Sequence, residues 1–317
     1  LRNGEVILKR RYFICPRCKA KATPLDRVLG LEGRYSQMVD ELMGLVDVLG
    51  SSRKAEEMLW RLSGLRISYR VIHQKAVELG EELEELQQSS LPGGRLPADT
   101  SRAYTSADGV MVNTKTGYHE MKLACLWSEG NDYRRYTATM EPCDKFGQKV
   151  RRMVCLAGGH TIDELVAIAD GAAWIWEQVR TRLPFVSTQI VDFYHAAEQI
   201  ATAARALHGE GTQAAKNWLR DARHVLRHEG GRALLKKLKK SRHYRRGNEA
   251  IHALVGYISK HVQRMDYPRL KSAGLTIGSG LIESGCKNVV QMRLKGPGMR
   301  WRPEAASAVA NLRGLFL

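Results

Sequence analysis

The spacing of apolar residues changes twice along this 317-residue chain. Between residues 25 and 90 apolar positions recur every three to four residues, which predicts helices. Past Pro97 the spacing falls to two, which predicts strands separated by short turns such as 129–132. Helical and strand-like runs then alternate up to Asp192, and helical spacing alone follows. The predicted strands are 104–107, 118–127, 133–139, 165–169 and 187–191.

This order of elements is that of an RNase H-like α/β domain with a five-stranded mixed sheet. The first three strands form an antiparallel meander, and the last two extend it in parallel because a helix precedes each of them. The predicted parts are a partial zinc-ribbon-like segment (1–24), a helical helix-turn-helix-like DNA-binding region (25–90), the first part of the RNase H-like catalytic core (96–195), a basic all-α insertion (196–275) and the C-terminal helices of the core (276–317).

Residues 51–85 have the outline of a helix-turn-helix unit. Ser51 and Ser68 are N-cap candidates, and Gly64 lies in the short turn between the two predicted helices. Two arginines near the start of the second helix suit contact with phosphate. Any helical hairpin has the same outline, so the sequence leaves both interpretations open. Residues 89–94, with the sequence SSLPGG, are predicted to be a linker.

Cys15 and Cys18 form a CxxC motif after the apolar and basic run 6–14. Such a motif is typical of one half of a zinc ribbon, a structural site that needs four ligands. No second pair lies nearby, so Zn²⁺ is expected only if the first half of the ribbon precedes Leu1. The alternative is a pair of reduced thiols in a loop.

The charge of the chain indicates a polyanionic partner. It has 50 Lys and Arg against 33 Asp and Glu, a formal net charge of +17. Such an excess favours nucleic acid first of all. Eleven Lys and Arg but two acids lie between residues 220 and 246, which predicts phosphate contacts from the insertion. The candidates for DNA binding there are Lys236, Lys237, Lys239, Lys240, Arg242, Arg245 and Arg246.

The chain contains no run of 18 apolar residues, so no membrane span is expected. Its six cysteines lack the spacing of a disulfide framework, which is typical of a reducing compartment. We therefore expect a cytoplasmic, nucleoid-associated protein.

Three carboxylates are candidates for a metal site. Asp108 and Asp170 each follow a predicted strand, and the carboxyl ends of strands are where α/β sheets bind ligands. Glu283, at the edge of the apolar stripe of a later helix, adds a third. Hard divalent ions prefer such oxygen ligands, and two ions about 4 Å apart serve phosphoryl transfer. The alternatives are Asp-Gly turns and a solvated Glu–Lys pair formed by Glu283 and Lys287.

Four segments, in order, resemble the motifs of DDE transposases of bacterial insertion sequences: SADGVMV (106–112), AIADGAAWIW (167–176), VDFYH (191–195) and GSGLIES (278–284). The resemblance is to the ISKra-four group, related to the Mutator-like transposases, and it extends over residues 96–317 with GMRW at 298–301. It implies that Asp108, Asp170 and Glu283 are the catalytic triad and bind Mg²⁺, or Mn²⁺ in its place. Asp192 and His195 match the family's DxxH element, and we interpret them as supporting residues that contact the flipped or cleaved strand.

The implied reaction is cleavage of double-stranded DNA at the ends of a mobile element, followed by joining of the freed 3′-OH to target DNA. The implied partners are terminal inverted repeats, target DNA and a second copy of the chain, in a homodimer or a larger assembly. Many DDE enzymes have Lys or Arg seven positions after the Glu, where this chain has Val290. The residues expected near the cut are Lys287, Arg293, Lys295, Arg300 and Trp301, with a core position as the alternative for Trp301.

Two other functions fit the same features. A non-catalytic DNA-binding protein or inactive transposon remnant would use the helices and the charge without cutting DNA. An RNase H-like nuclease would share the metal site without joining ends.

Overall fold

The computed structural model describes residues 7–29, 34–90, 94–130 and 132–317. The chain forms two compact units. The helical unit comprises Leu1–Pro92, Met111–Met121 and Lys287–Leu317, and the α/β unit comprises Gly93–Val110 and Lys122–Cys286. Parts of three predictions lie outside the described residues: the start of the apolar run at 6, the linker at 91–93 and the turn at 131. No described helix is long and apolar enough to span a membrane.

The CxxC motif of the helical unit lies in the turn of a short hairpin. Strand β1 (Phe13–Ile14) pairs antiparallel with β2 (Lys21–Ala22), and α1 (Pro24–Val28) follows. Lys19 adopts a left-handed conformation with φ of 59°, and its N–H donates to the carbonyl of Cys15 at 3.0 Å. Both strands are exposed, so local hydrogen bonds rather than a core hold this hairpin.

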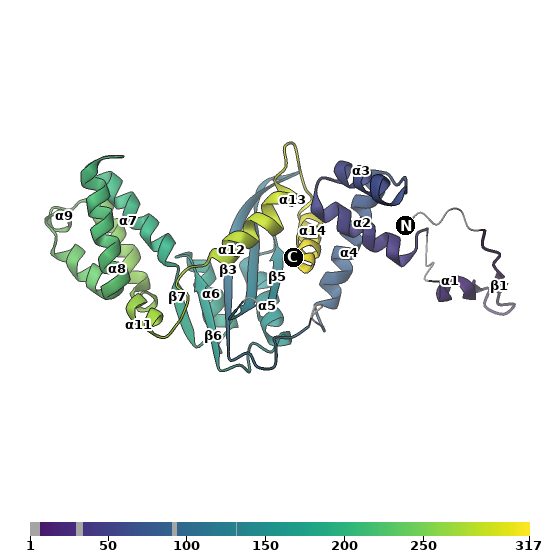
Figure 1. Cartoon of the computed structure of the whole chain (residues 1–317), viewed down its shortest axis with the longest axis horizontal. Coiled ribbons are helices and arrows are strands. Elements are labelled where there is room, and N and C mark those ends of the chain that lie inside the picture. Colours follow the sequence, from purple (N-terminus) through teal and green to yellow (C-terminus); the bar gives the residue numbers. More distant parts are fainter. Residues whose placement is uncertain (1–6, 30–33, 91–93, 131) are drawn as a thin grey trace. The chain divides into compact units, whose positions relative to one another are not determined.

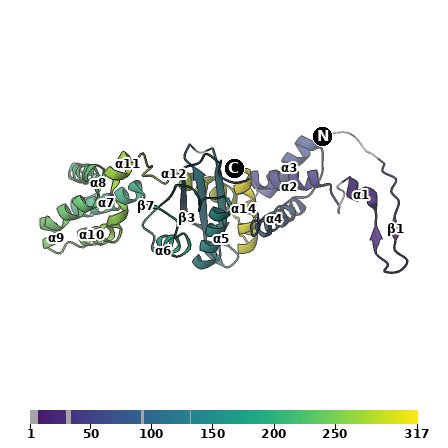
Figure 2. The same ribbon diagram turned by 90° about the horizontal axis from the view of Figure 1, so that it is seen from below.

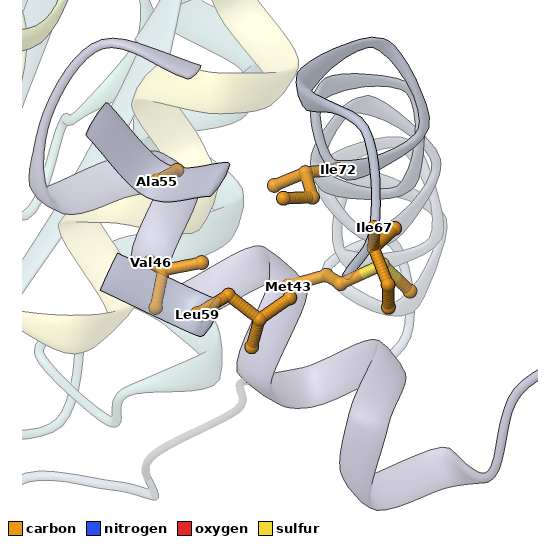
Figure 3. Close-up of a cluster of buried hydrophobic side chains, with 6 residues drawn as sticks. All are labelled: Met43, Val46, Ala55, Leu59, Ile67 and Ile72. Atoms are coloured by element: carbon orange, nitrogen blue, oxygen red, sulfur yellow. The ribbon is translucent and has the colours of Figure 1, made fainter. Parts of the chain in front are cut away.

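Three helices follow: α2 (Gln37–Leu49), α3 (Ser52–Ser63) and α4 (Tyr69–Leu86). The hydroxyl of Ser51 caps α3 by accepting the N–H of Lys54, as predicted, and Gly64 ends this helix with φ of 76°. Figure 3 shows the apolar cluster that joins the helices, which consists of Met43, Val46, Ala55, Leu59, Ile67 and Ile72. The helical spacing is thus confirmed, while DNA reading by α3 and α4 stays a prediction.

The last helix, α14 (Pro303–Phe316), packs along α4. A Cβ atom on Gly80 of α4 would lie 2.3 Å from the backbone oxygen of Ala308, so glycine is needed for this close approach. Nearly all of α14 is buried, which identifies it as the central helix of this unit.

The α/β unit is built on a mixed sheet with the strand order β5-β4-β3-β6-β7. Two residues join β3 to β4, a connection that only antiparallel strands allow, and β4 and β5 are also antiparallel. β6 pairs in parallel with β3, and β7 pairs in parallel with β6. The predicted five-stranded mixed sheet is confirmed. Its strands are β3 (Arg102–Thr114), β4 (Gly117–Ser128), β5 (Arg134–Thr139), β6 (Glu164–Ala169) and β7 (Thr188–Val191).

Helices cover both faces of this sheet. Helices α5 (Cys143–Leu156) and α6 (Ala173–Arg182) line a small apolar cavity together with β3 and β6. On the other face, Gly285 at the end of α12 (Gly280–Gly285) meets the side chain of Leu123 on β4. Figure 2 shows α12 on the opposite side of the sheet from α5 and α6. Because both faces are covered, β6 is an almost continuous buried apolar run.

After β7 the chain forms the predicted helical segment (Figure 1). Its longest helix, α8, is kinked at Gly230, whose φ of 85° and ψ of 174° interrupt the helix. The N–H of Gly231 donates to the carbonyl of Met265 at 2.8 Å, which fixes the kink. The helices are α7 (Phe193–His208), α8 (Gln213–Lys240), α9 (Arg242–Arg245), α10 (Glu249–His261) and α11 (Tyr267–Ser272), with a 3₁₀ turn η1 (Val262–Arg264).

The segment that carries Glu283 begins with α12 and widens into a π-helix, η2 (Cys286–Gln291), before α13 (Met292–Leu294). Its predicted apolar stripe is buried: Ile282, Cys286, Val289 and Val290. π-Helical turns inside helices are often found at functional sites.

Candidate active site

Asp108 and Asp170 lie at matching positions of two adjacent parallel strands. Thr105 of β3 pairs with Ala167 of β6, and each aspartate lies three residues further along the chain, Asp108 within β3 and Asp170 directly after β6. Adjacent strands are about 4.8 Å apart, so the two aspartates are side by side. From β3 the chain adds β4 and β5 on one side and then β6 and β7 on the other side. Open α/β sheets bind ligands at such a switch point in the strand order.

The position of Asp108 differs from the prediction. Asp108 was expected to end a strand before an Asp-Gly turn, but β3 continues through Gly109 to Thr114. The alternation of buried Val110 and Val112 keeps the chain extended, and the turn comes only after Thr114. Asp170, in contrast, directly follows β6 as predicted.

Specific hydrogen bonds orient both carboxylates. Asp108 Oδ1 accepts the N–H of Gly109 at 2.7 Å, and its Oδ2 accepts the thiol of Cys286 at 3.4 Å. Asp170 Oδ1 accepts the N–H of Ala172 at 2.8 Å, while the indole of Trp176 donates to its main-chain carbonyl at 2.8 Å. Each aspartate therefore keeps at least one oxygen lone pair for a ligand.

The electrostatics of Asp170 reflect its neighbour. Burial raises the pKa of Asp170, and the charge of Asp108 raises it further, although the N–H of Ala172 acts in the opposite direction. Two carboxylates that disfavour each other's ionisation are stabilised by a cation between them.

Glu283 reaches the same neighbourhood through His195. His195 Nε2 lies 3.8 Å from Glu283 Oε1, and its Nδ1 lies 3.5 Å from Glu198 Oε2. The side chains of Glu283 and His195 are 53% and 35% exposed, so both are open to a ligand from solvent. Positive charge on His195 acts on the pKa of Asp170, which connects this pair to the aspartates.

Asp192 has a different role from the one expected. It was predicted to contact the cleaved strand, but it is completely buried. Its Oδ1 caps α7 by accepting the N–H groups of Tyr194 and His195 at 2.5 and 3.0 Å, and its Oδ2 accepts the N–H of Ser279. Asp192 thus joins the start of α7 to the turn before α12 and fixes the spacing between His195 and Glu283.

Within residues 7–29, 34–90, 94–130 and 132–317, no three His, Cys, Asp or Glu side chains converge closely enough to hold a metal ion by themselves. The three predicted carboxylates are nevertheless linked in one chain of contacts. Asp170 and Asp108 interact electrostatically, Cys286 contacts Asp108, and the charge of Glu283 acts on the same thiol. A bound ion would need water or substrate oxygens to complete its ligands.

Two residues of α10 (Glu249–His261) that were not predicted from the sequence, Tyr257 and His261, lie near this site. A Cβ atom on Gly171 would lie 2.4 Å from Cε2 of Tyr257, so this ring packs on the turn that carries Asp170. Burial raises the pKa of Tyr257, and the charge of Asp170 adds to the effect. His261, whose ring lies 5.1 Å from that of Tyr257, is buried, and burial lowers its pKa to about 4. Nothing in the local sequence of α10 marks either residue.

The predicted DNA-binding residues of the insertion are all exposed, and none of them forms an ion pair with a residue in the described part of the chain. They lie on the C-terminal half of α8, beyond the kink at Gly230, and on α9 and the residue after it. They are Lys236, Lys237, Lys239, Lys240, Arg242, Arg245 and Arg246. Unpaired positive charge on exposed helices is what contact with phosphate requires.

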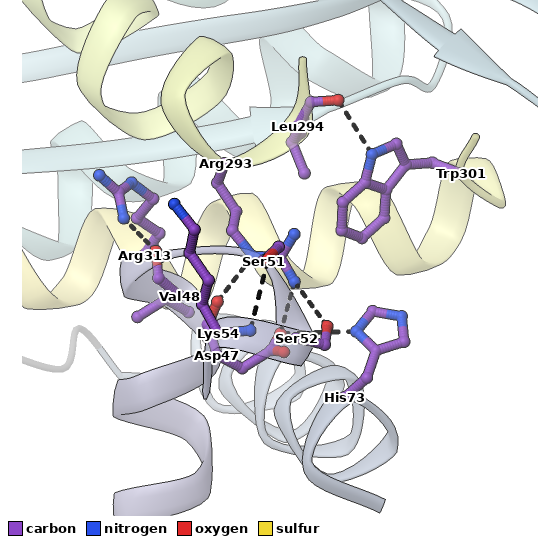
Figure 4. A network of polar contacts seen from close by, with 10 residues as sticks. All are labelled: Asp47, Val48, Ser51, Ser52, Lys54, His73, Arg293, Leu294, Trp301 and Arg313. Atoms are coloured by element: carbon purple, nitrogen blue, oxygen red, sulfur yellow. Dashed lines mark hydrogen bonds and ion pairs between the residues drawn. The ribbon is translucent and has the colours of Figure 1, made fainter. Parts of the chain in front are cut away.

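Arg293 was predicted to contact DNA, but it is buried with only 2% of its surface exposed (Figure 4). Its Nη2 forms an ion pair with Asp47 Oδ2 at 2.7 Å, and its Nε donates to the main-chain carbonyl of Asp47 at 2.7 Å. A buried, paired guanidinium cannot reach a phosphate, so this prediction is corrected.

Trp301 is also buried, and its indole donates to the carbonyl of Leu294 at 3.0 Å. Arg293 lies over its ring, 4.8 Å from the centroid, so Trp301 takes the alternative role of a core anchor. Lys287, Lys295 and Arg300 are exposed and remain candidates for DNA contact.

Cys15 and Cys18 lie together at the tip of the first hairpin. The N–H of Cys18 points to the sulfur of Cys15 at 3.5 Å, and this contact lowers the pKa of the Cys15 thiol. The arrangement suits half of a tetrahedral zinc site, and zinc binding itself stays a prediction.

Comparisons with known proteins give only distant similarities, all of them to solved structures. No family model and no curated protein matches the chain. Among solved structures it is similar to the Drosophila P element transposase strand transfer complex, with a TM-score of 0.31 and 10% identity over 92% of this chain and 81% of that one. Similarity at this level defines neither a shared fold nor a shared activity.

Proposed function

We propose that this chain is a DDE-type transposase with an RNase H-like core, which cuts and joins double-stranded DNA by metal-dependent phosphoryl transfer. The observation that supports this most strongly is the matched placement of Asp108 on β3 and of Asp170 directly after β6, the parallel neighbour of β3. Glu283 and His195 add a carboxylate and an imidazole at the exposed side of these aspartates. Exposed basic helices in the same unit provide charge for the DNA backbone.

A divalent cation fits the residues present. Two adjacent carboxylates, one with a raised pKa, favour a cation, and their oxygens are the ligands that Mg²⁺ and Mn²⁺ prefer. Mg²⁺ commonly uses one or two carboxylates and takes its other ligands from water and substrate phosphate, so Asp108 and Asp170 would suffice as its protein ligands. When bound, the ion would polarise the phosphodiester and neutralise the negative charge that develops on its oxygens.

The side chains have distinct parts in this proposal. Asp108 and Asp170 hold the ion, and their backbone hydrogen bonds keep them oriented without it. Glu283, which is half exposed, would meet the substrate, with His195 Nε2 3.8 Å from its carboxylate. Asp192 sets the position of His195 and lies outside the reaction.

The proposed partners are the terminal inverted repeats and the target DNA. The exposed lysines and arginines of α8 and α9 would neutralise phosphates, with counterion release as the driving force. Joining two ends to one target requires two such sites, so we propose a homodimer in the DNA complex.

The test of this function is a strand-transfer assay with labelled duplexes that carry the ends of the element encoding the chain. We expect Mg²⁺-dependent nicks at the end, followed by products in which the labelled end is joined to an unlabelled target. Cut products without joined ones would indicate the nuclease alternative. DNA binding without either product would indicate the non-catalytic alternative.

A further inference from the structure

The thiol of Cys286 lies against the first carboxylate of the site. Cys286 follows Glu283 by three residues, on the same helical segment, and is only 3% exposed. Its Sγ lies 3.4 Å from Asp108 Oδ2. One side chain therefore connects the helix that carries Glu283 with the strand that carries Asp108.

The thiol acts as the donor in this contact. The hydrogen bond runs from the Cys286 thiol to Asp108 Oδ2, and an ionised carboxylate oxygen can only accept. The other oxygen of Asp108 accepts the N–H of Gly109 at 2.7 Å. Two donors from different elements thus define the plane of this carboxylate.

The packing of the helical segment holds Cys286 in place. A Cβ atom on Gly285 would lie 2.7 Å from Tyr136 Cε1 and 3.2 Å from Leu123 Cδ2, so the backbone lies directly on the sheet. The helix changes from α to π at Cys286, and a π-turn rotates the following side chains relative to a regular helix. The change from α-helix to π-helix therefore occurs at Cys286, the residue that contacts Asp108.

We propose that Cys286 is a positioning residue, whose thiol fixes the rotamer of Asp108 and the spacing between Asp108 and Glu283. This inference rests on the proposed metal-dependent function. The thiol itself would not be a ligand, because it donates its proton to the carboxylate. Partners that orient a metal-binding carboxylate typically change metal affinity by about 10–100-fold when they are removed.

The first experiment compares the Mg²⁺ concentration needed for half-maximal nicking in wild type and three variants. Cys286→Ala, which removes the donor, should raise this concentration by roughly 10–100-fold. Cys286→Ser keeps a donor and should restore most of the affinity. The matched control is Cys125→Ala, because Cys125 on β4 is equally buried but bonds to Tyr136 rather than to Asp108. An unchanged Mg²⁺ requirement in Cys286→Ala would overturn the proposal.

The second experiment needs no activity. The S–H stretching band of Cys286, assigned by difference Raman spectra against Cys286→Ser, should shift when Asp108 is replaced by Asn, whereas the band of Cys125 should not. If wild-type protein shows no nicking, the function proposal fails, and this shift still shows the contact with Asp108. A Cys286 band that Asp108→Asn leaves unchanged would overturn the inference, whatever the activity.

Discussion

Replacing Asp170 by Asn is expected to slow Mg²⁺-dependent nicking roughly a thousand-fold or more, because the ion's contribution of several kcal/mol is lost. DNA affinity should stay nearly unchanged. Asn has the same shape and still accepts the N–H of Ala172, so the turn after β6 keeps its structure. The substitution removes only the negative charge beside Asp108. Initial nicking rates at saturating Mg²⁺ and binding in EDTA measure the two effects separately.

The matched control for this variant is Asp163→Asn. Asp163 is exposed and directly precedes β6, whereas Asp170 directly follows it. The control therefore removes the same charge at the other end of the same strand. This control should nick DNA at the wild-type rate. If Asp170→Asn did the same, Asp170 would not belong to the site.

The second large effect concerns stability. Arg293→Ala should lower the free energy of unfolding by about 3–5 kcal/mol, because it removes the buried cation that is paired with Asp47. Asp47 is completely buried, and His73 Nδ1, at 3.4 Å, is a much more exposed partner. The loss should appear in urea unfolding followed by far-UV circular dichroism.

Lys295→Ala is the matched control, since Lys295 is exposed two positions later and should change stability by no more than about 0.5 kcal/mol. If the two variants were equally stable and Arg293→Ala bound DNA more weakly, the original DNA-contact prediction would be right and the buried ion pair wrong.

The same pair predicts a dependence on pH. Burial would raise the pKa of Asp47, but His73, Arg293 and Ser52 outweigh it, and the pKa is lowered overall. A carboxyl group with a lowered pKa in the folded state stabilises the protein above its unfolded pKa and loses this contribution as pH falls. The stability difference between wild type and Arg293→Ala should therefore decrease in acid.

Much of the fold could be predicted because it depends on local spacing. The alternating sequence of β4, the short apolar run of β6, the cap at Ser51 and the end of β6 before Asp170 all follow from residues close in sequence. The limit of local reasoning shows at Asp108. An Asp-Gly pair is typical of a turn, but the long hairpin of β3 and β4 keeps it inside a strand.

The rest depends on partners distant in sequence. Arg293 lies among other basic residues in the sequence, which favours DNA binding, yet its ion-pair partner Asp47 lies 246 residues away. Asp192 resembles a catalytic residue, but its cap on α7 and its bond to Ser279 become visible only when residues 87 apart meet. Cys286 and Tyr257 were missed for the same reason, since only tertiary packing brings them to Asp108 and Asp170.

The central claim is that Asp108 and Asp170 bind one divalent cation together. Mn²⁺ binding, measured by electron paramagnetic resonance without DNA, tests it most directly in wild type, Asp108→Asn and Asp170→Asn. Wild type should bind Mn²⁺ at least roughly tenfold more tightly than either variant, and Glu283→Gln should change the affinity less because that side chain is half exposed. Equal Mn²⁺ affinity in wild type and both aspartate variants would contradict the account.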